Sequence, residues 1–183
     1  MLYTRKGDDG TTKTFGCNQR VSKSSAIAEA LGGCDEINSL LGLCKVKSKE
    51  AGFVINSKKF SDIIHTVQQN LFIVQAQLAG ADKKISQDKI TEIEAIIDSA
   101  ENELPPIKTF FISGGSELGA LFDYARTIAR RAERRVVLVN EEKMATILPE
   151  TLSYLNRLSS LFYALARLSN HKYGIKEEPP SYD

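Results

Sequence analysis

Three charged side chains lie together on one predicted helix, where they could bind an anion. In the stretch DYARTIARRAERRVVLVN (123–140), apolar residues recur at steps of three and four, which predicts a helix with one buried stripe. Arg126, Arg130 and Glu133 fall beside that stripe, whereas Arg131 points the other way. Arginines at a core margin need an anionic partner, because an unpaired buried charge is costly. Glu133 balances only part of the cluster, which indicates a carboxylate elsewhere, a neighbouring subunit or a bound anion. RRAERR alone favours a solvated face.

The N-terminal segment, residues 1–24, offers groups that suit a phosphate chain. TRKGDDGTTK contains two glycines that make backbone amides accessible, three hydroxyls and three cations. It is neither a P-loop nor a dinucleotide fingerprint, because the sequence contains no GxxxxGKS/T and no GxGxxG. Composition alone favours a flexible surface tail for this segment.

Other polar and aromatic residues are candidates for a site. Phe110 and Phe111 are adjacent in the loop PPIKTFFISGGSE, so one can fill the core while the other faces a pocket, although burial of both is favoured. Asp35 flanks the apolar stripe of an earlier helix and is able to pair with Arg126, but a lone helical aspartate is most often a surface group. A polar line runs down the last helix through Asn156, Ser160, Tyr163 and Arg167.

Five helices must position these residues. They are predicted over 25–47, 57–79, 86–104, the arginine-rich stretch that follows Ser116, and 148–173. Ser86 and Ser116 are expected N-caps, and Gly174 follows the last helix. No strand pattern of any strength and no repeat is present. The sequence predicts one domain, 1–183, that is an all-α five-helix bundle with an extended N-terminal phosphate-binding segment and a disordered tail, 176–183.

Composition excludes several classes of protein. The 24 basic and 23 acidic residues nearly cancel, which argues against sequence-independent nucleic-acid binding. Three cysteines without a CxxC pair favour reduced thiols and an intracellular location. No signal peptide and no apolar run long enough to span a membrane is evident. We therefore expect no membrane partner and a cytoplasmic protein, or a mitochondrial matrix protein in a eukaryote.

Metal and nucleophile chemistry have little support. A di-iron bundle needs paired ExxH segments, but the chain has two histidines, and only Asp62 with His65 has a carboxylate at that spacing. Three scattered cysteines make a structural zinc site improbable. No serine has an evident histidine and aspartate to activate it.

Six separated motifs, in order along the chain, resemble those of the PduO-type corrinoid adenosyltransferases (ATP:cob(I)alamin adenosyltransferases). They are YTRKGDDGTT, RVSK, EALGGCDEINSLLG, FFISGG, ARTIARRAERRVV and YLNRLSSLFYALAR. Each motif is moderately specific, and the six together cover almost the whole chain. The resemblance implies a trimer of five-helix bundles with ATP sites between subunits, and it outweighs the surface interpretations above.

The resemblance also implies roles for residues. Phe110 would close beneath the corrin ring and displace its lower ligand, and Asp35 would pair with Arg126 of a neighbouring subunit. The implied catalytic residues are Phe110, Arg126, Arg130 and Asp35. The implied ATP-binding residues are Thr4, Arg5, Lys6, Gly7, Thr12, Lys13, Lys23, Arg130, Arg131, Glu133, Arg134 and Asn156. No protein ligand to a metal is implied, because Mg²⁺ would bind through the ATP phosphates.

The implied reaction transfers the 5′-deoxyadenosyl group of ATP to the cobalt of cob(I)alamin and releases triphosphate. A corrinoid reductase and a cobalamin-dependent acceptor enzyme are possible partners. The alternatives are a non-catalytic ATP- or cobalamin-sensing or chaperone bundle, and a basic-helix nucleic-acid binder, which the charge balance disfavours. Two positions depart from the family pattern: Ser113 replaces a proline before the double glycine, and Ser160 replaces an aspartate.

Overall fold

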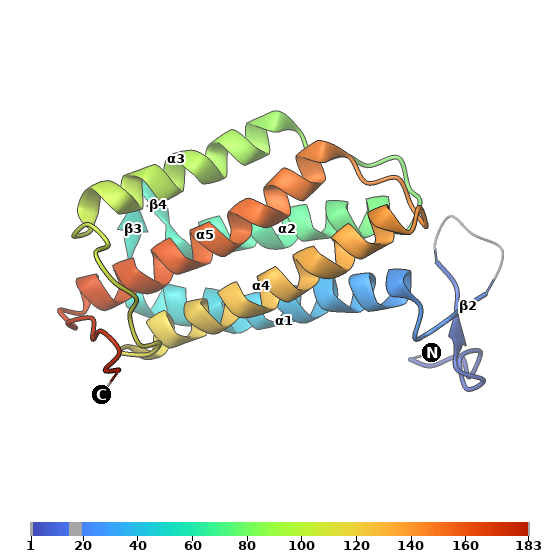
Figure 1. Cartoon of the computed structure of the whole chain (residues 1–183), viewed down its shortest axis with the longest axis horizontal. Coiled ribbons are helices and arrows are strands. Elements are labelled where there is room, and N and C mark those ends of the chain that lie inside the picture. The colour runs from blue at the N-terminus through green and yellow to red at the C-terminus, as the bar shows by residue number, and fades with distance from the viewer. Residues whose placement is uncertain (1, 15–19, 183) are drawn as a thin grey trace.

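Five long helices make up most of the structure, a computed structural model that describes residues 2–14 and 20–182. α4 packs on both α1 and α5, α2 packs on α1, and α3 packs on α5 (Figure 1). The predicted all-α bundle is therefore confirmed. The helices are α1 (Ala26–Ala51), α2 (Phe60–Leu78), α3 (Gln87–Glu103), α4 (Glu117–Glu141) and α5 (Pro149–Lys172).

The central helix, α4, forms where its apolar stripe predicts it. Ser116 is its N-cap, and the Ser116 hydroxyl accepts a hydrogen bond from the amide of Gly119 at 3.0 Å. The apolar stripe of α4 is buried against its neighbours, and Phe122 in this stripe is fully inaccessible to solvent. Gly33 lets α1 approach closely, because a Cβ there would lie 3.4 Å from the Cα of Ala132. This stripe fixes which side of α4 remains available for its arginines.

Two helix ends differ from their predicted positions, the C-terminal end of α1 and the start of α2. α1 continues four residues past the predicted end and stops at Gly52, whose φ of 67° suits glycine. α2 starts later than predicted, because β3 (Val54–Ile55) and β4 (Lys58–Lys59) form an antiparallel hairpin in front of it. Asn56 and Ser57 form its two-residue turn with φ of 46° and 59°, the signature of a type I′ turn. The expectation that the chain has no strands was wrong here.

A second small hairpin lies in the N-terminal segment. β1 (Thr11–Thr12) pairs with β2 (Val21–Ser22) in antiparallel register. Figure 1 shows this segment beyond the N-terminal end of α1, whereas the C-terminus lies at the opposite end of the bundle. Among the described residues, no helix is long and apolar enough to cross a membrane.

Two cysteines are buried between helices and are free thiols. Cys34 and Cys44 have no exposed surface, and burial raises the pKa of each thiol to about 12. Cys17 lies outside the described residues.

We expect neither Cys34 nor Cys44 to react with iodoacetamide at pH 8 in the folded protein, because the attacking thiolate is suppressed and covered. Both should be alkylated rapidly in denaturant. Peptide mapping by mass spectrometry measures each site separately. Fast labelling of either one in the native state would contradict the packing of α1 described here.

Candidate active site

A groove of about 640 Å³ lies between the loop that precedes α4 and the exposed edges of α4 and α5. Phe110 and Phe111 line it from the loop, and Arg126 and Arg130 line it from α4. Three of the four residues with an implied catalytic role, Phe110, Arg126 and Arg130, therefore share one surface. Its remaining lining residues are Ile107, Lys108, Thr109, Ser113, Asp123, Ser159, Ser160 and Tyr163.

Phe110 and Phe111 are not both buried in the core, although the sequence alone favoured burial of both. The side chain of Phe110 is 79% exposed, so it stands free at the groove. Phe111 is half-buried, and the guanidinium of Arg167 lies 5.2 Å from its ring centroid. The adjacent side chains thus have different surroundings, and Phe110 is the one available to a ligand.

Arg126 has an anionic partner on its own helix. Its Nε donates to Oδ1 of Asp123 at 2.7 Å, and its guanidinium lies 5.9 Å from the ring centroid of Tyr163. Asp123 is only 13% exposed, and desolvation raises the pKa of Tyr163. Asp35 is exposed on α1 and makes no ion pair within the described part of the chain. The pairing of Asp35 with Arg126 is therefore not an intrachain contact.

The remaining arginines of α4 divide into two groups. Arg131 pairs with Glu36, and Nη2 of Arg135 lies 2.7 Å from Oε2 of Glu29, so both arginines face α1. By contrast, Arg130 and Arg134 are exposed and have no ion-pair partner among the described residues. These two guanidiniums are the cations on α4 that are available for an external anion.

A polar network crosses from α4 to α3 through α5. Asn156 donates to Oε1 of Glu133 at 2.9 Å, and Asn156 Oδ1 accepts from Arg157 at 2.9 Å. Arg157 in turn donates to Oε1 of Glu94 at 2.8 Å. Glu133 and Asn156, both implied ATP-binding residues, are thus in direct contact. Arg157 was missed by sequence reasoning, although it fixes which way the Asn156 amide points.

The N-terminal half of the implied ATP site forms a compact loop of its own. Lys23 Nζ donates to the carbonyl of Gly7 at 2.7 Å, and Arg20 pairs with Asp9 at 3.5 Å. A hydrogen bond from the Thr11 hydroxyl is the main cause that lowers the pKa of Asp9. The other implied members are exposed or half-buried around this loop: Thr4, Arg5, Lys6, Thr12 and Lys13.

The two halves of the implied ATP set do not meet within one chain. In the described ranges, no hydrogen bond or ion pair joins residues 2–14 or 20–24 to α4 or α5. Figure 1 shows the N-terminal segment beyond the end of the bundle, away from the middle of α4. A single chain therefore presents each half to solvent separately.

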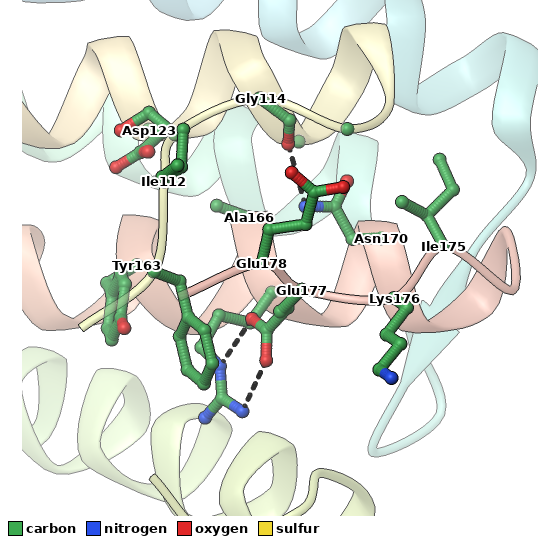
Figure 2. Close-up of a pocket in the computed structure, with 15 residues that line it drawn as sticks. Ile112, Gly114, Asp123, Tyr163, Ala166, Asn170, Ile175, Lys176, Glu177 and Glu178 are labelled. Atoms are coloured by element: carbon green, nitrogen blue, oxygen red, sulfur yellow. Dashed lines mark hydrogen bonds and ion pairs between the residues drawn. The ribbon is translucent and has the colours of Figure 1, made fainter. Parts of the chain in front are cut away.

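Behind the groove lies a smaller pocket of about 210 Å³, where α5 holds the loop (Figure 2). Asn170 Nδ2 donates to the carbonyl of Gly114 at 2.8 Å, while its Oδ1 accepts from the amide and hydroxyl of Ser116. Gly115, with φ of 96°, has no room for a side chain, because a Cβ would lie 2.8 Å from Asn170 Oδ1. Nothing in the local sequence pattern identified Asn170.

Part of the C-terminal tail, whose composition predicts disorder over 176–183, contacts the rest of the chain. Glu177 forms two hydrogen bonds with Arg167, at 2.7 and 2.8 Å, and the carbonyl of Glu178 accepts from the amide of Ile112 at 2.8 Å. The ion pair places this part of the tail beside the loop, because it neutralises a nearly buried guanidinium. Asp183 lies outside the described residues.

The two departures from the family pattern both lie at the groove. Ser113 and Ser160 line it from the loop and from α5. Neither hydroxyl has a hydrogen-bond partner among the described residues.

Comparison with known proteins assigns the chain to a family. A family model described as "Cobalamin adenosyltransferase" matches residues 2–169. The chain belongs to this family. It is 39% identical over 181 residues to the corrinoid adenosyltransferase of Bacillus subtilis, which covers 95% of the chain and 89% of that relative.

Other cobalamin adenosyltransferase relatives are longer. The chain is 38% identical over 177 residues to the corrinoid adenosyltransferase PduO of Citrobacter freundii, with 93% of the chain covered. It spans 50% of that relative and 48% of the Salmonella typhimurium PduO, so it corresponds to about half of each.

Solved structures from the same family have the same fold. A phenylalanine-to-histidine variant of the PduO-type ATP:corrinoid adenosyltransferase from Lactobacillus reuteri, complexed with cobalamin and ATP, matches with a TM-score of 0.86 and 30% identity. The match covers 100% of this chain and 97% of that one. An arginine-to-lysine variant from the same organism, complexed with ATP, matches with a TM-score of 0.84 and 28% identity, covering 98% of this chain and 100% of that one.

Proposed function

We propose that this chain transfers the 5′-deoxyadenosyl group of ATP to the cobalt of cob(I)alamin and yields adenosylcobalamin and triphosphate. The observation that carries the proposal is the groove, in which an exposed phenylalanine and two arginines face the same space in a member of the cobalamin adenosyltransferase family. The L. reuteri relative with nearly the same fold is described as complexed with both cobalamin and ATP.

The proposed chemistry is a substitution at the 5′ carbon of ATP. The cobalt(I) of the substrate supplies both electrons of the new cobalt–carbon bond, and the carbon–oxygen bond to triphosphate breaks. No side chain has to act as a base, because the nucleophile carries no proton. The protein must align the two substrates, an effect worth about 7–11 kcal/mol in favourable cases, and stabilise the anionic leaving group.

The residues present suit these two tasks. Phe110 offers an apolar surface that would exclude water and a lower ligand from the corrin ring, which favours reduction of cobalt(II). Among the described residues no carboxylate pairs with Arg130 or Arg134, so their charge is available to triphosphate. We assign Thr4, Arg5, Lys6, Gly7, Thr12, Lys13 and Lys23 to the other side of the phosphates.

We propose that the complete ATP site forms between subunits of a homotrimer. The separation of its two halves within one chain supports this arrangement, as does Asp35, which is exposed and has no ion-pair partner within residues 2–14 and 20–182. Large apolar side chains also stand exposed on α1 and α4, with Leu43 58% and Tyr124 56% accessible. A second copy that covers them would bury apolar surface and bring Asp35 to Arg126.

We propose that Mg²⁺ enters with the triphosphate. Among the described residues, no group of three or more His, Cys, Asp or Glu side chains is placed to hold a metal ion. The cations around the site suit a phosphate chain instead, and Mg²⁺ commonly binds through phosphates and water. When bound, it would neutralise part of the leaving-group charge.

We propose a corrinoid reductase and a cobalamin-dependent acceptor enzyme as partners that act before and after this step. A cytoplasmic location, or the mitochondrial matrix in a eukaryote, suits the free thiols of Cys34 and Cys44.

The deciding experiment is anaerobic. The protein is mixed with ATP, Mg²⁺ and chemically reduced cob(I)alamin while the corrin absorption spectrum and triphosphate are followed. Equal amounts of adenosylcobalamin and triphosphate would support the proposal. ATP binding without either product would refute it and favour a sensor or chaperone that retains the fold.

The two groups of arginines on α4 provide a matched test of the ATP site. Arg130→Ala should raise the KM for ATP on the order of tenfold, because it removes a charge-assisted contact to phosphate. Arg135→Ala removes the same charge from the same helix but from a side chain that pairs with Glu29, so the KM for ATP should change little. Initial rates at varied ATP measure both variants; equal effects would contradict the assignment of Arg130.

A further inference from the structure

One guanidinium joins three segments behind the groove: α5, the C-terminal tail and the loop that precedes α4. Arg167, on α5, forms a two-point ion pair with Glu177 of the tail and donates to the carbonyl of Pro105 at 3.1 Å. It also lies against the ring of Phe111, next to Phe110 in the chain. Figure 2 shows the tail residues Glu177 and Glu178 beside the loop residues Ile112 and Gly114. The tail and α5 thus hold the loop from its far side.

The pair is mostly removed from solvent. The side chain of Arg167 is 6% exposed and that of Glu177 is 19% exposed, and the hydrogen bonds that Arg167 donates to Glu177 are the main cause that raises the pKa of Arg167. Removal of one partner from a buried pair leaves the other charge uncompensated, which is costlier than loss of a surface pair. The guanidinium would then need a new anion, and its contacts with Pro105 and Phe111 would be disturbed.

The loop depends on these contacts for its position. Besides Arg167, the amide of Asn170 binds the carbonyl of Gly114, and the backbone of Glu178 binds the amide of Ile112. Phe110 itself is exposed and receives little support from packing. Its location at the groove is therefore set by anchors on either side of it, at Pro105, Phe111, Ile112 and Gly114.

We propose that Arg167 and Glu177 are positioning residues for the corrinoid side of the site. Through this pair the C-terminal tail holds the loop so that Phe110 projects into the groove. The inference rests on the proposed function in that the ligand of the groove is taken to be a corrinoid. It assigns neither residue a direct contact with substrate.

The test compares two variants that each remove one negative charge from adjacent tail positions. Glu177→Gln keeps the size of the side chain but loses the ionic contact to Arg167. Glu178→Ala keeps the backbone hydrogen bond to Ile112 and serves as the control. Thermal unfolding and circular dichroism establish that both variants are folded.

The first measurement is amide hydrogen exchange over residues 105–115 without substrates. Glu177→Gln should speed exchange in this loop on the order of tenfold, while exchange in α1 and α2 stays unchanged. Glu178→Ala should match the wild type. Equal loop exchange in all three proteins would overturn the proposal.

The second measurement separates positioning from mere stability. Glu177→Gln should raise the KM for cob(II)alamin in a coupled assay with a chemical reductant, whereas the KM for ATP should stay unchanged. It should also weaken the spectroscopic signal of enzyme-bound four-coordinate cob(II)alamin, the form without a lower ligand. Faster loop exchange with unaltered corrinoid parameters would also overturn the proposal. A wild-type chain with no adenosylation at all would refute the proposed function instead, and the exchange data would still decide whether the pair holds the loop.

Discussion

Phe110→Ala is expected to slow adenosylation that starts from cob(II)alamin on the order of 100-fold, while the reaction with prereduced cob(I)alamin loses much less. The side chain is 79% exposed at the groove, so its removal does not open a cavity in the core. What is lost is the apolar surface that would keep water and a lower ligand from cobalt. That surface matters for reduction of cobalt(II) more than for the attack by cobalt(I).

The comparison needs both assays in the same buffer and one control variant. Ile112→Ala removes another large exposed apolar side chain from the same loop, but Ile112 does not line the groove. Its rates should stay near those of the wild type. If Phe110→Ala lowers the adenosylation rate by the same factor in both assays, Phe110 has no special role in displacing the lower ligand.

Arg126→Ala is expected to abolish most activity and to weaken the proposed trimer. Truncation of one partner of a buried interfacial charge pair costs about 2–5 kcal/mol, much of it from the charge that is left behind. Sedimentation at a series of protein concentrations measures the association, and the cob(I)alamin assay measures activity. A trimer of unchanged strength with full activity would remove Arg126 from the interface.

Two further variants decide which aspartate matters. Asp35→Asn should weaken the proposed trimer as Arg126→Ala does, because Asp35 has no ion-pair partner in the part of its own chain that the structure describes. Asp123→Asn removes the intrachain partner, which lies 2.7 Å away, and should leave association largely intact. If only Asp123→Asn reproduces the effect of Arg126→Ala, then Arg126 acts within its own subunit.

Helical periodicity was sufficient to predict the five helices, because each has a buried stripe long enough to register in the sequence. It failed at residues 54–59, because it predicts a helix that begins at Ser57, whereas α2 begins at Phe60. Two residues with positive φ make a tight turn there, and such a short hairpin leaves almost no alternating pattern.

The site was only partly predictable. Asp123 lies three residues before Arg126, a spacing that permits a helical ion pair, yet sequence reasoning considered only Glu133 as a local partner. Arg167 was placed on a polar line of α5, but its partner Glu177 lies in a segment whose composition predicts disorder. The contact between Arg167 and Glu177 depends on how the tail folds back onto α5. The spacing of residues along the sequence does not encode that arrangement. In the proposed trimer the N-terminal segment meets α4 of a second chain, and local spacing does not encode that contact either.

The separation of the N-terminal phosphate loop from α4 within one chain has a genetic consequence. Suppose that each ATP site takes its N-terminal loop from one subunit and its arginines from another. Lys6→Ala then impairs the subunit that supplies the loop, and Arg130→Ala impairs the subunit that supplies the arginines. Chains carrying either lesion, mixed and reassembled in equal amounts, would regain intact sites at about one quarter of the interfaces. Two impaired alleles of one gene would then complement each other in the same cell, whereas two lesions in α4 would not.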